Sequence, residues 1–239
     1  MKKPVHIFVI ESEEPHSSTS VRQIWGKIKT ELQHSGSLGK SEFAEASTKS
    51  DLQDAATNFQ TWTGLLPMSE PIVLWLSIHG VDPEPGVPDG QRNLVGTSGA
   101  SAKCEAVDWA CFFGPIKLAN DPHRVIVLMD VCWGSSPTAP ACLATPSATR
   151  PAFIFGPARD AYRSELDTAS ESLFHLLCKK GIPGADEAKK LVDSINSMFP
   201  AATPKSTPFY RVWWQKNATG LQRYPEPPSL ETVTRVKRP

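Results

Sequence analysis

Hydrophobic residues gather in short continuous runs that alternate with stretches of helical periodicity. The runs at 5–10, 72–78 and 125–129 are rich in β-branched residues and leucine, which is typical of buried strands. Apolar residues recur every three or four positions in segments 21–32 and 52–62, which predicts helices there. Strands that alternate with helices predict an α/β fold in which a mainly parallel sheet is covered on both faces.

The same alternation continues toward the C-terminus. Residues 152–155 are expected to form a short strand, and two helices are expected at about 167–180 and 186–198. The apolar segment 209–214 then predicts an edge strand, which brings the sheet to about six strands. In contrast, residues 80–103 are polar and rich in Gly and Pro, so the pattern predicts a long loop.

Length and composition favour one globular domain. The chain has 239 residues, of which 40% are hydrophobic, and this is enough to bury a substantial core. We expect a single domain over residues 1–224, followed by a flexible proline-containing tail at 225–239.

One more helix is expected between two strands of the sheet, and it carries Trp109, Phe112 and Phe113.

Net charge indicates which types of partner the protein binds, and the cysteines indicate the cellular compartment in which it resides. Lys plus Arg and Asp plus Glu number 25 each, so no net field favours nucleic acid or an anionic membrane. Five cysteines without C-x-x-C spacing favour a reducing compartment. The short apolar N-terminal run is interrupted by Glu11, and no run reaches the roughly 18 residues that span a bilayer. These observations predict a cytoplasmic protein.

Two short motifs end neighbouring predicted strands. The sequence Ser-Ile-His-Gly closes the 72–78 run with His79 and Gly80, and Asp-Val-Cys-Trp-Gly follows the 125–129 run with Cys132 and Gly134. The C-terminal ends of parallel strands are where open α/β sheets carry their chemistry. An imidazole facing a thiol is the minimal arrangement of a cysteine nucleophile with its base.

The glycines of these motifs add to the pattern. Gly80 allows close backbone approach to a substrate, and its N–H together with that of Cys132 can hold an oxyanion. Gly134 would permit a tight turn that leaves the sulfur exposed. Structural explanations remain open, since His79 can be a satisfied turn histidine and Cys132 a buried small hydrophobic residue. A zinc site built from His79 and Cys132 would need two further ligands, which we cannot place in the sequence.

The two motifs resemble the His-Gly and Cys-x-Gly elements of caspase-like cysteine peptidases, a group that includes metacaspases and bacterial caspase-like and CHAT-type peptidases. The 53 residues between His79 and Cys132 also match the spacing of caspase-type enzymes. The resemblance extends from the strand at 5–10 to the strand at 209–214, and it implies a three-layer α/β/α sandwich. It also implies His79 as general base and acid, Cys132 as nucleophile, and the Gly80 and Cys132 amides as the oxyanion hole.

By the same resemblance, the expected reaction is hydrolysis of a protein or peptide substrate through a thioester acyl-enzyme, without a metal or other cofactor. Metacaspases carry an Asp two residues before the nucleophile, where it selects Arg or Lys at P1, and Asp130 stands at that place here. Glu11 and Asp160 are further candidates for the same acidic S1 pocket. Arg159 and Arg163 argue against a basic preference. Alternatively, Asp130 is a strand-end carboxylate satisfied by backbone N–H groups.

Some features depart from the eukaryotic caspases. The Gln-Ala-Cys-x-Gly motif is absent, and the only basic residue of the 135–151 linker is Arg150, which precedes Pro151. We therefore expect activity as a single chain or activation by a regulatory protein partner. Two other interpretations stay open: a catalytically inactive caspase-like module that binds a partner protein, and an unrelated flavodoxin-like or hydrolase-like protein with an incidental cysteine.

Overall fold

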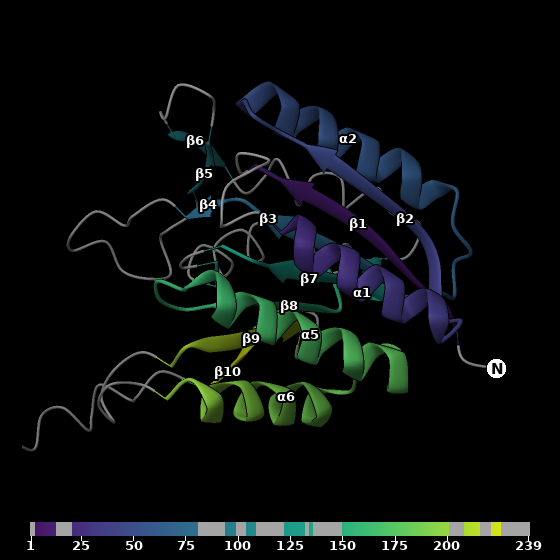
Figure 1. The fold of residues 1–239 in the computed structure, drawn as a ribbon, viewed down its shortest axis with the longest axis vertical. Coiled ribbons are helices and arrows are strands. Elements are labelled where there is room, and N and C mark those ends of the chain that lie inside the picture. Colours follow the sequence, from purple (N-terminus) through teal and green to yellow (C-terminus); the bar gives the residue numbers. More distant parts are fainter. Residues whose placement is uncertain are drawn as a thin grey trace, which may run out of the picture.

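A seven-stranded sheet organises the chain. The computed structural model describes residues 3–12, 21–80, 94–98, 104–108, 122–131, 134–135, 150–200, 208–215 and 221–225. The strands of the sheet are β1 (Val5–Glu11), β2 (Leu38–Glu45), β3 (Ile72–Ser77), β7 (Val125–Met129), β8 (Phe153–Pro157), β9 (Tyr210–Gln215) and β10 (Leu221–Tyr224). Their spatial order is β10-β9-β8-β7-β3-β1-β2, and the five strands from β2 to β8 run parallel (Figure 1). The predicted mainly parallel sheet is confirmed.

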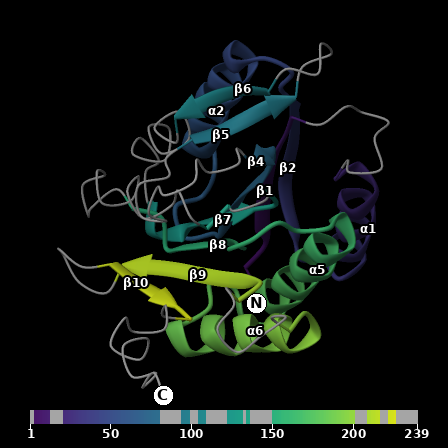
Figure 2. The same ribbon diagram turned by 90° about the vertical axis from the view of Figure 1, so that its left-hand side faces the viewer.

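Helices cover both faces of this sheet. They are α1 (Arg22–His34), α2 (Lys49–Gly64), α5 (Arg163–Lys180) and α6 (Ala185–Met198). The connection from β1 to β2 and the connection from β2 to β3 cross the sheet in opposite directions, so right-handed crossovers place α1 and α2 on opposite faces. Figure 2 shows α2 on one side of the sheet and α1 with α5 on the other, so the layers form the predicted α/β/α sandwich.

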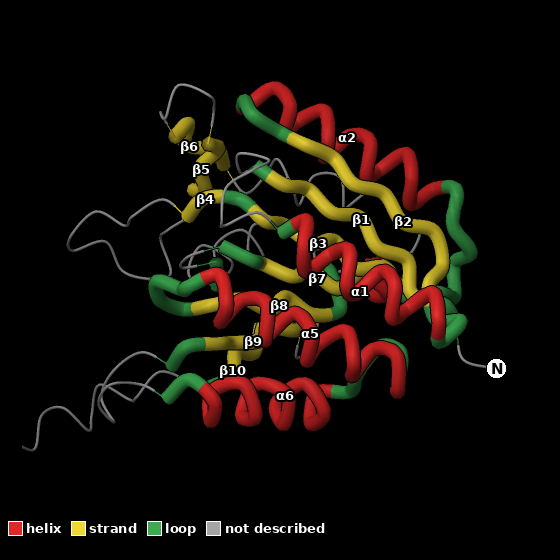
Figure 3. Tube along the Cα trace, in the orientation of Figure 1, coloured by secondary structure: helices red, strands yellow, loops and turns green. Residues whose placement is uncertain are grey.

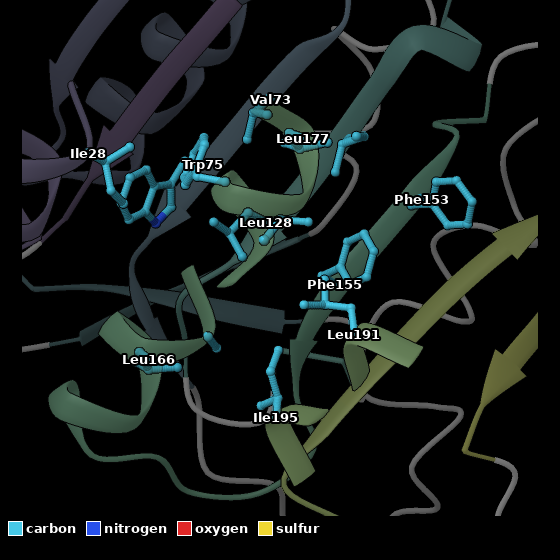
Figure 4. Packing of buried hydrophobic residues seen from close by; sticks show 14 of the residues in the cluster. Ile28, Val73, Trp75, Leu128, Phe153, Phe155, Leu166, Leu177, Leu191 and Ile195 are labelled. Carbon is cyan, nitrogen blue, oxygen red and sulfur yellow. The ribbon is translucent and has the colours of Figure 1, made fainter. Parts of the chain in front are cut away.

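Successive side chains of each strand point to opposite faces of the sheet, so the buried residues form two separate hydrophobic cores. In β1, Ile7 and Val9 face α1 and α5, whereas Phe8 and Ile10 face α2. The larger core joins the inner strands to α1, α5 and α6, with Trp75 fully buried near its centre (Figure 4). Because side chains alternate with a period of two, this division of faces continues to the strand ends, where the candidate catalytic residues follow.

Three elements differ from the sequence prediction. β2 is an additional strand with an exposed, polar pattern, and the segment at 209–214 forms β9, which β10 covers, so β9 is not an edge strand. Part of the expected 80–103 loop is strand β5 (Leu94–Ser98), which joins β4 (His79–Gly80) and β6 (Cys104–Asp108) in a small antiparallel sheet. Figure 3 shows this small sheet beyond the end of β3.

Several expectations lie outside the described residues. These are the helix around Trp109, Phe112 and Phe113, and the tail apart from Pro225. None of the helices that the structure describes is both long and apolar enough to cross a membrane.

Candidate active site

The register of β3 and β7 brings the two candidate motifs to the same edge of the sheet. These strands are parallel neighbours, and Leu76 is paired with Met129. The ladder continues one step further, because the Asp130 N–H donates to the Leu76 carbonyl at 2.8 Å. His79 and Cys132 each follow three residues after the paired Leu76 and Met129. Adjacent strands lie about 4.8 Å apart, so the two segments leave the sheet side by side.

The backbone of the His-Gly motif is held in a strand. In β4, His79 is paired with Gly96 and Gly80 with Val95. The side chain of His79 and all of Cys132 lie outside the described part of the structure. The Cys-His dyad and the oxyanion hole formed by the Gly80 and Cys132 amides therefore stay predictions.

The chain on either side of residues 132 and 133 is tightly fixed. The Gly134 N–H donates to the Val131 carbonyl at 2.9 Å, and the Ser135 N–H donates to Pro157 at 2.8 Å. A Cβ atom at Gly134 would lie 2.6 Å from Val131 Cγ1 and 2.9 Å from Met129 Cβ. Glycine is therefore required here by close packing of the turn against the end of β7.

Asp130 is fully buried, and side chains from two other elements satisfy it. Its carboxylate accepts hydrogen bonds from the Trp75 indole Nε1 at 2.8 Å, the Ser170 hydroxyl at 3.0 Å and the Arg163 guanidinium at 2.8 Å. None of the Asp130 side chain is exposed. The alternation of the strand accounts for this direction, because Asp130 follows Met129 of the α2 face and so points toward α5.

Arg163 joins this carboxylate to a second one. Its Nε atom donates to Asp167 at 2.6 Å, and 13% of its side chain is exposed. Burial disfavours the guanidinium charge, but Asp130 and Asp167 outweigh burial, so the pKa of Arg163 lies above its ordinary value. Burial raises the pKa of Asp167, and Arg163 opposes that effect. Burial, reinforced by the negative charge of Asp130, raises the pKa of Tyr210 well above its ordinary value.

The other two expected S1 carboxylates lie in different environments. Glu11 ends β1 and is buried, where it accepts the Val21 N–H at 2.8 Å and pairs with Arg22 at 3.2 Å. Asp160 precedes α5 and is exposed. Of the three carboxylates, two are thus buried against an arginine that opens a helix.

Sequence reasoning missed the partners of Asp130. Trp75, Arg163 and Ser170 lie 33 to 55 residues away in the chain, on other elements. Two features of the sequence could have indicated these partners. Arg163 and Asp167 are four residues apart at the start of a helix, and a serine lies on the apolar face of that helix.

A buried histidine and a surface cavity also occur among the described residues. His6 is buried near the start of β1, where Nε2 lies 2.5 Å from Glu70 and Nδ1 accepts the Lys40 N–H at 2.9 Å. Within the described ranges, no three His, Cys, Asp or Glu side chains group so that they could hold a metal ion. A cavity of about 510 Å³ opens between β2 and α2, and its lining includes none of the candidate site residues.

Comparisons with known proteins show the fold. No protein-family model and no curated protein sequence matches the chain. Among 33 matching chains of solved structures are two of a secreted C11 cysteine protease from Bacteroides thetaiotaomicron. One, in complex with an irreversible peptide inhibitor, is 10% identical with a TM-score of 0.50, and the match covers 88% of this chain and 66% of that one. The other, called iotapain, is 11% identical with a TM-score of 0.52, and the match covers 90% and 67%.

Caspase-1 from Spodoptera frugiperda also matches, at 12% identity and a TM-score of 0.49, over 89% of this chain and 87% of that chain. The two matches to the bacterial proteases show the caspase-like fold that the motifs of this chain predicted, and the chain spans about two thirds of the length of those proteases.

Proposed function

We propose that this protein is a cysteine endopeptidase that hydrolyses protein or peptide substrates with Cys132 as nucleophile and His79 as general base and acid. The observation that carries the proposal is the β3–β7 register, because His79 and Cys132 come three positions after Leu76 and Met129, which are paired in these neighbouring parallel strands. The fold supports the same conclusion, since solved structures that share it are cysteine proteases.

The chemistry needs only groups of this chain. His79 removes the thiol proton, and the Cys132 thiolate attacks the scissile carbonyl to form a tetrahedral oxyanion. The Gly80 and Cys132 amides donate hydrogen bonds to that oxyanion. His79 then protonates the leaving amine, which leaves a thioester on Cys132. Water attacks the thioester with His79 as base, and this step releases the second product and restores the thiol.

Cleavage of a peptide library tests this mechanism. Cys132→Ala and His79→Ala are each expected to fold normally and to lose several orders of magnitude in kcat, because nucleophile and base act as a unit. Cys178→Ala is the matched control, since Cys178 lies near the end of α5 and should leave turnover unchanged. Cleavage by Cys132→Ala at the wild-type rate would exclude the mechanism. An inactive wild-type protein would favour the partner-binding module instead.

The same library determines the P1 preference, for which we propose Arg or Lys. Asp130 is buried and accepts three hydrogen bonds, so we assign the contact with a basic P1 residue to Asp160, the exposed member of the three expected carboxylates. Asp160→Asn should raise KM for Arg and Lys peptides by up to about fivefold, the range of an exposed ion pair. Turnover of Asp peptides but not Arg peptides would contradict a basic preference. Activation by a protein partner remains a separate prediction.

A further inference from the structure

We infer that Asp130 is a positioning residue: its carboxylate, paired with Arg163 of α5, accepts the Trp75 N–H and so holds the strand leading to Cys132 against the strand leading to His79. We name the group formed by Asp130, Arg163, Trp75 and Ser170 the Asp130 clamp. Its catalytic consequence rests on the proposed function, while its existence as a clamp does not.

The clamp joins the two candidate catalytic strands directly. Trp75 lies in β3 four residues before His79, and Asp130 lies two residues before Cys132. The Trp75 indole donates to the Asp130 carboxylate at 2.8 Å, and the Asp130 N–H donates to the Leu76 carbonyl at 2.8 Å. Side chain and main chain of one residue therefore both bind β3, which fixes its position along the neighbouring strand.

Packing fixes the direction of the Trp75 donor. Trp75 is fully buried, and its ring centroid lies 5.2 Å from that of Phe174 and 6.2 Å from that of Trp25. Such a ring cannot turn without disturbing both α1 and α5, so packing alone fixes the direction of its N–H. Figure 4 shows the Trp75 ring beside Ile28 of α1.

The geometry also closes Asp130 to a substrate. Its side chain has no exposed surface, and three donors already occupy it. A substrate guanidinium would have to displace Arg163, whose Nε is bound to Asp167 at 2.6 Å. Removing Arg163 would leave a buried carboxylate without its counter-charge, which is far costlier than losing an exposed pair. In this chain the Asp130 carboxylate thus binds side chains of β3 and α5 and is not free to bind a substrate.

Kinetics on peptides with different P1 residues test this role. We expect Asp130→Asn and Arg163→Met to lower kcat by about tenfold or more for every P1 residue, because small displacements of reacting groups are costly. KM should stay within about twofold of wild type. Arg163→Lys, which keeps the charge, should recover part of the rate. Ser170→Ala, which removes one donor to Asp130, should also lower kcat. Its matched control is Ser172→Ala, since Ser172 lies on the same helix and bonds only to the Thr168 carbonyl among the described partners.

Two results would overturn the inference. If Asp130→Asn raises KM for Arg and Lys peptides alone, Asp130 contacts the substrate. If Arg163→Met speeds the turnover of Arg peptides, Arg163 is a plug in the S1 pocket and not part of a clamp.

Stability measurements separate this inference from the proposed function. The urea midpoints of Asp130→Asn, Arg163→Met and the double variant form a cycle that needs no activity. We expect the double variant to be clearly less destabilised than the sum of the two single variants. Additive effects would exclude the clamp even in an active enzyme, whereas strong coupling in an inactive protein would retain the clamp and reject the peptidase.

Discussion

At the scale of single residues, two of the three carboxylates expected at the S1 pocket are buried and face arginines. Asp130 lies against Arg163, and Glu11 lies against Arg22, in both cases with little or no exposed surface on the acid. A buried side chain stays charged only when it is paired and hydrogen-bonded. The first residue of α1, Arg22, supplies this pairing to Glu11, and the first residue of α5, Arg163, supplies it to Asp130. The sequence indicated that Asp130 ends a buried strand, but not its donors, because they belong to elements that only the folded chain brings together.

Tyr210 offers a contrast to these satisfied groups. Its side chain is fully buried, and its hydroxyl has no hydrogen-bond partner within the described structure. Removing an unsatisfied buried hydroxyl costs little, so Tyr210→Phe should leave the urea midpoint unchanged or raise it. Tyr224→Phe is the matched control, because its hydroxyl bonds to Asp193 at 2.8 Å. A larger loss of stability for Tyr210→Phe than for Tyr224→Phe would show that the hydroxyl is bonded.

At the scale of elements, the end of β7 depends on a glycine that only close packing explains. The sequence suggested Gly134 for a tight turn, and the structure adds that Met129 and Val131 leave no space for a side chain. Continuous apolar runs predicted β1, β3, β7 and β8 within a few residues. β2 was missed, since its polar, half-exposed pattern is that of a sheet edge and not of a buried strand.

Gly134→Ala tests the packing of this turn. The added Cβ must move the turn or the end of β7, and we expect a loss of about 1–3 kcal/mol in the free energy of unfolding, together with reduced turnover. Gly26→Ala is the control, because Gly26 lies inside α1 with no atom within 4 Å of an added Cβ. That change should stabilise the protein by about 0.5–1 kcal/mol. A Gly134→Ala variant as stable and active as wild type would contradict the packing argument.

At the scale of the whole molecule, the topology turns two distant motifs into neighbours. The chain runs outward from β1 to β2 and then crosses back over β1 to β3, and β7 is added on the far side of β3. The C-terminal ends of β3 and β7 are therefore adjacent. The alternation of strands and helices predicted a mainly parallel sheet with helices on both faces, whereas the order of its strands is seen only in the folded chain. The small β4–β5–β6 sheet could not be predicted in the same way, since Gly and Pro residues dominate that region of the sequence and favour loops.

The rate of Cys132 alkylation by iodoacetamide at neutral pH tests the central claim most directly. A thiol activated by a neighbouring imidazole reacts faster than an ordinary one, so Cys132 should be modified well before Cys178 in the same sample. His79→Ala should slow Cys132 by about tenfold or more and leave Cys178 unchanged. If the reactivity of Cys132 does not depend on His79, the two residues do not form a dyad.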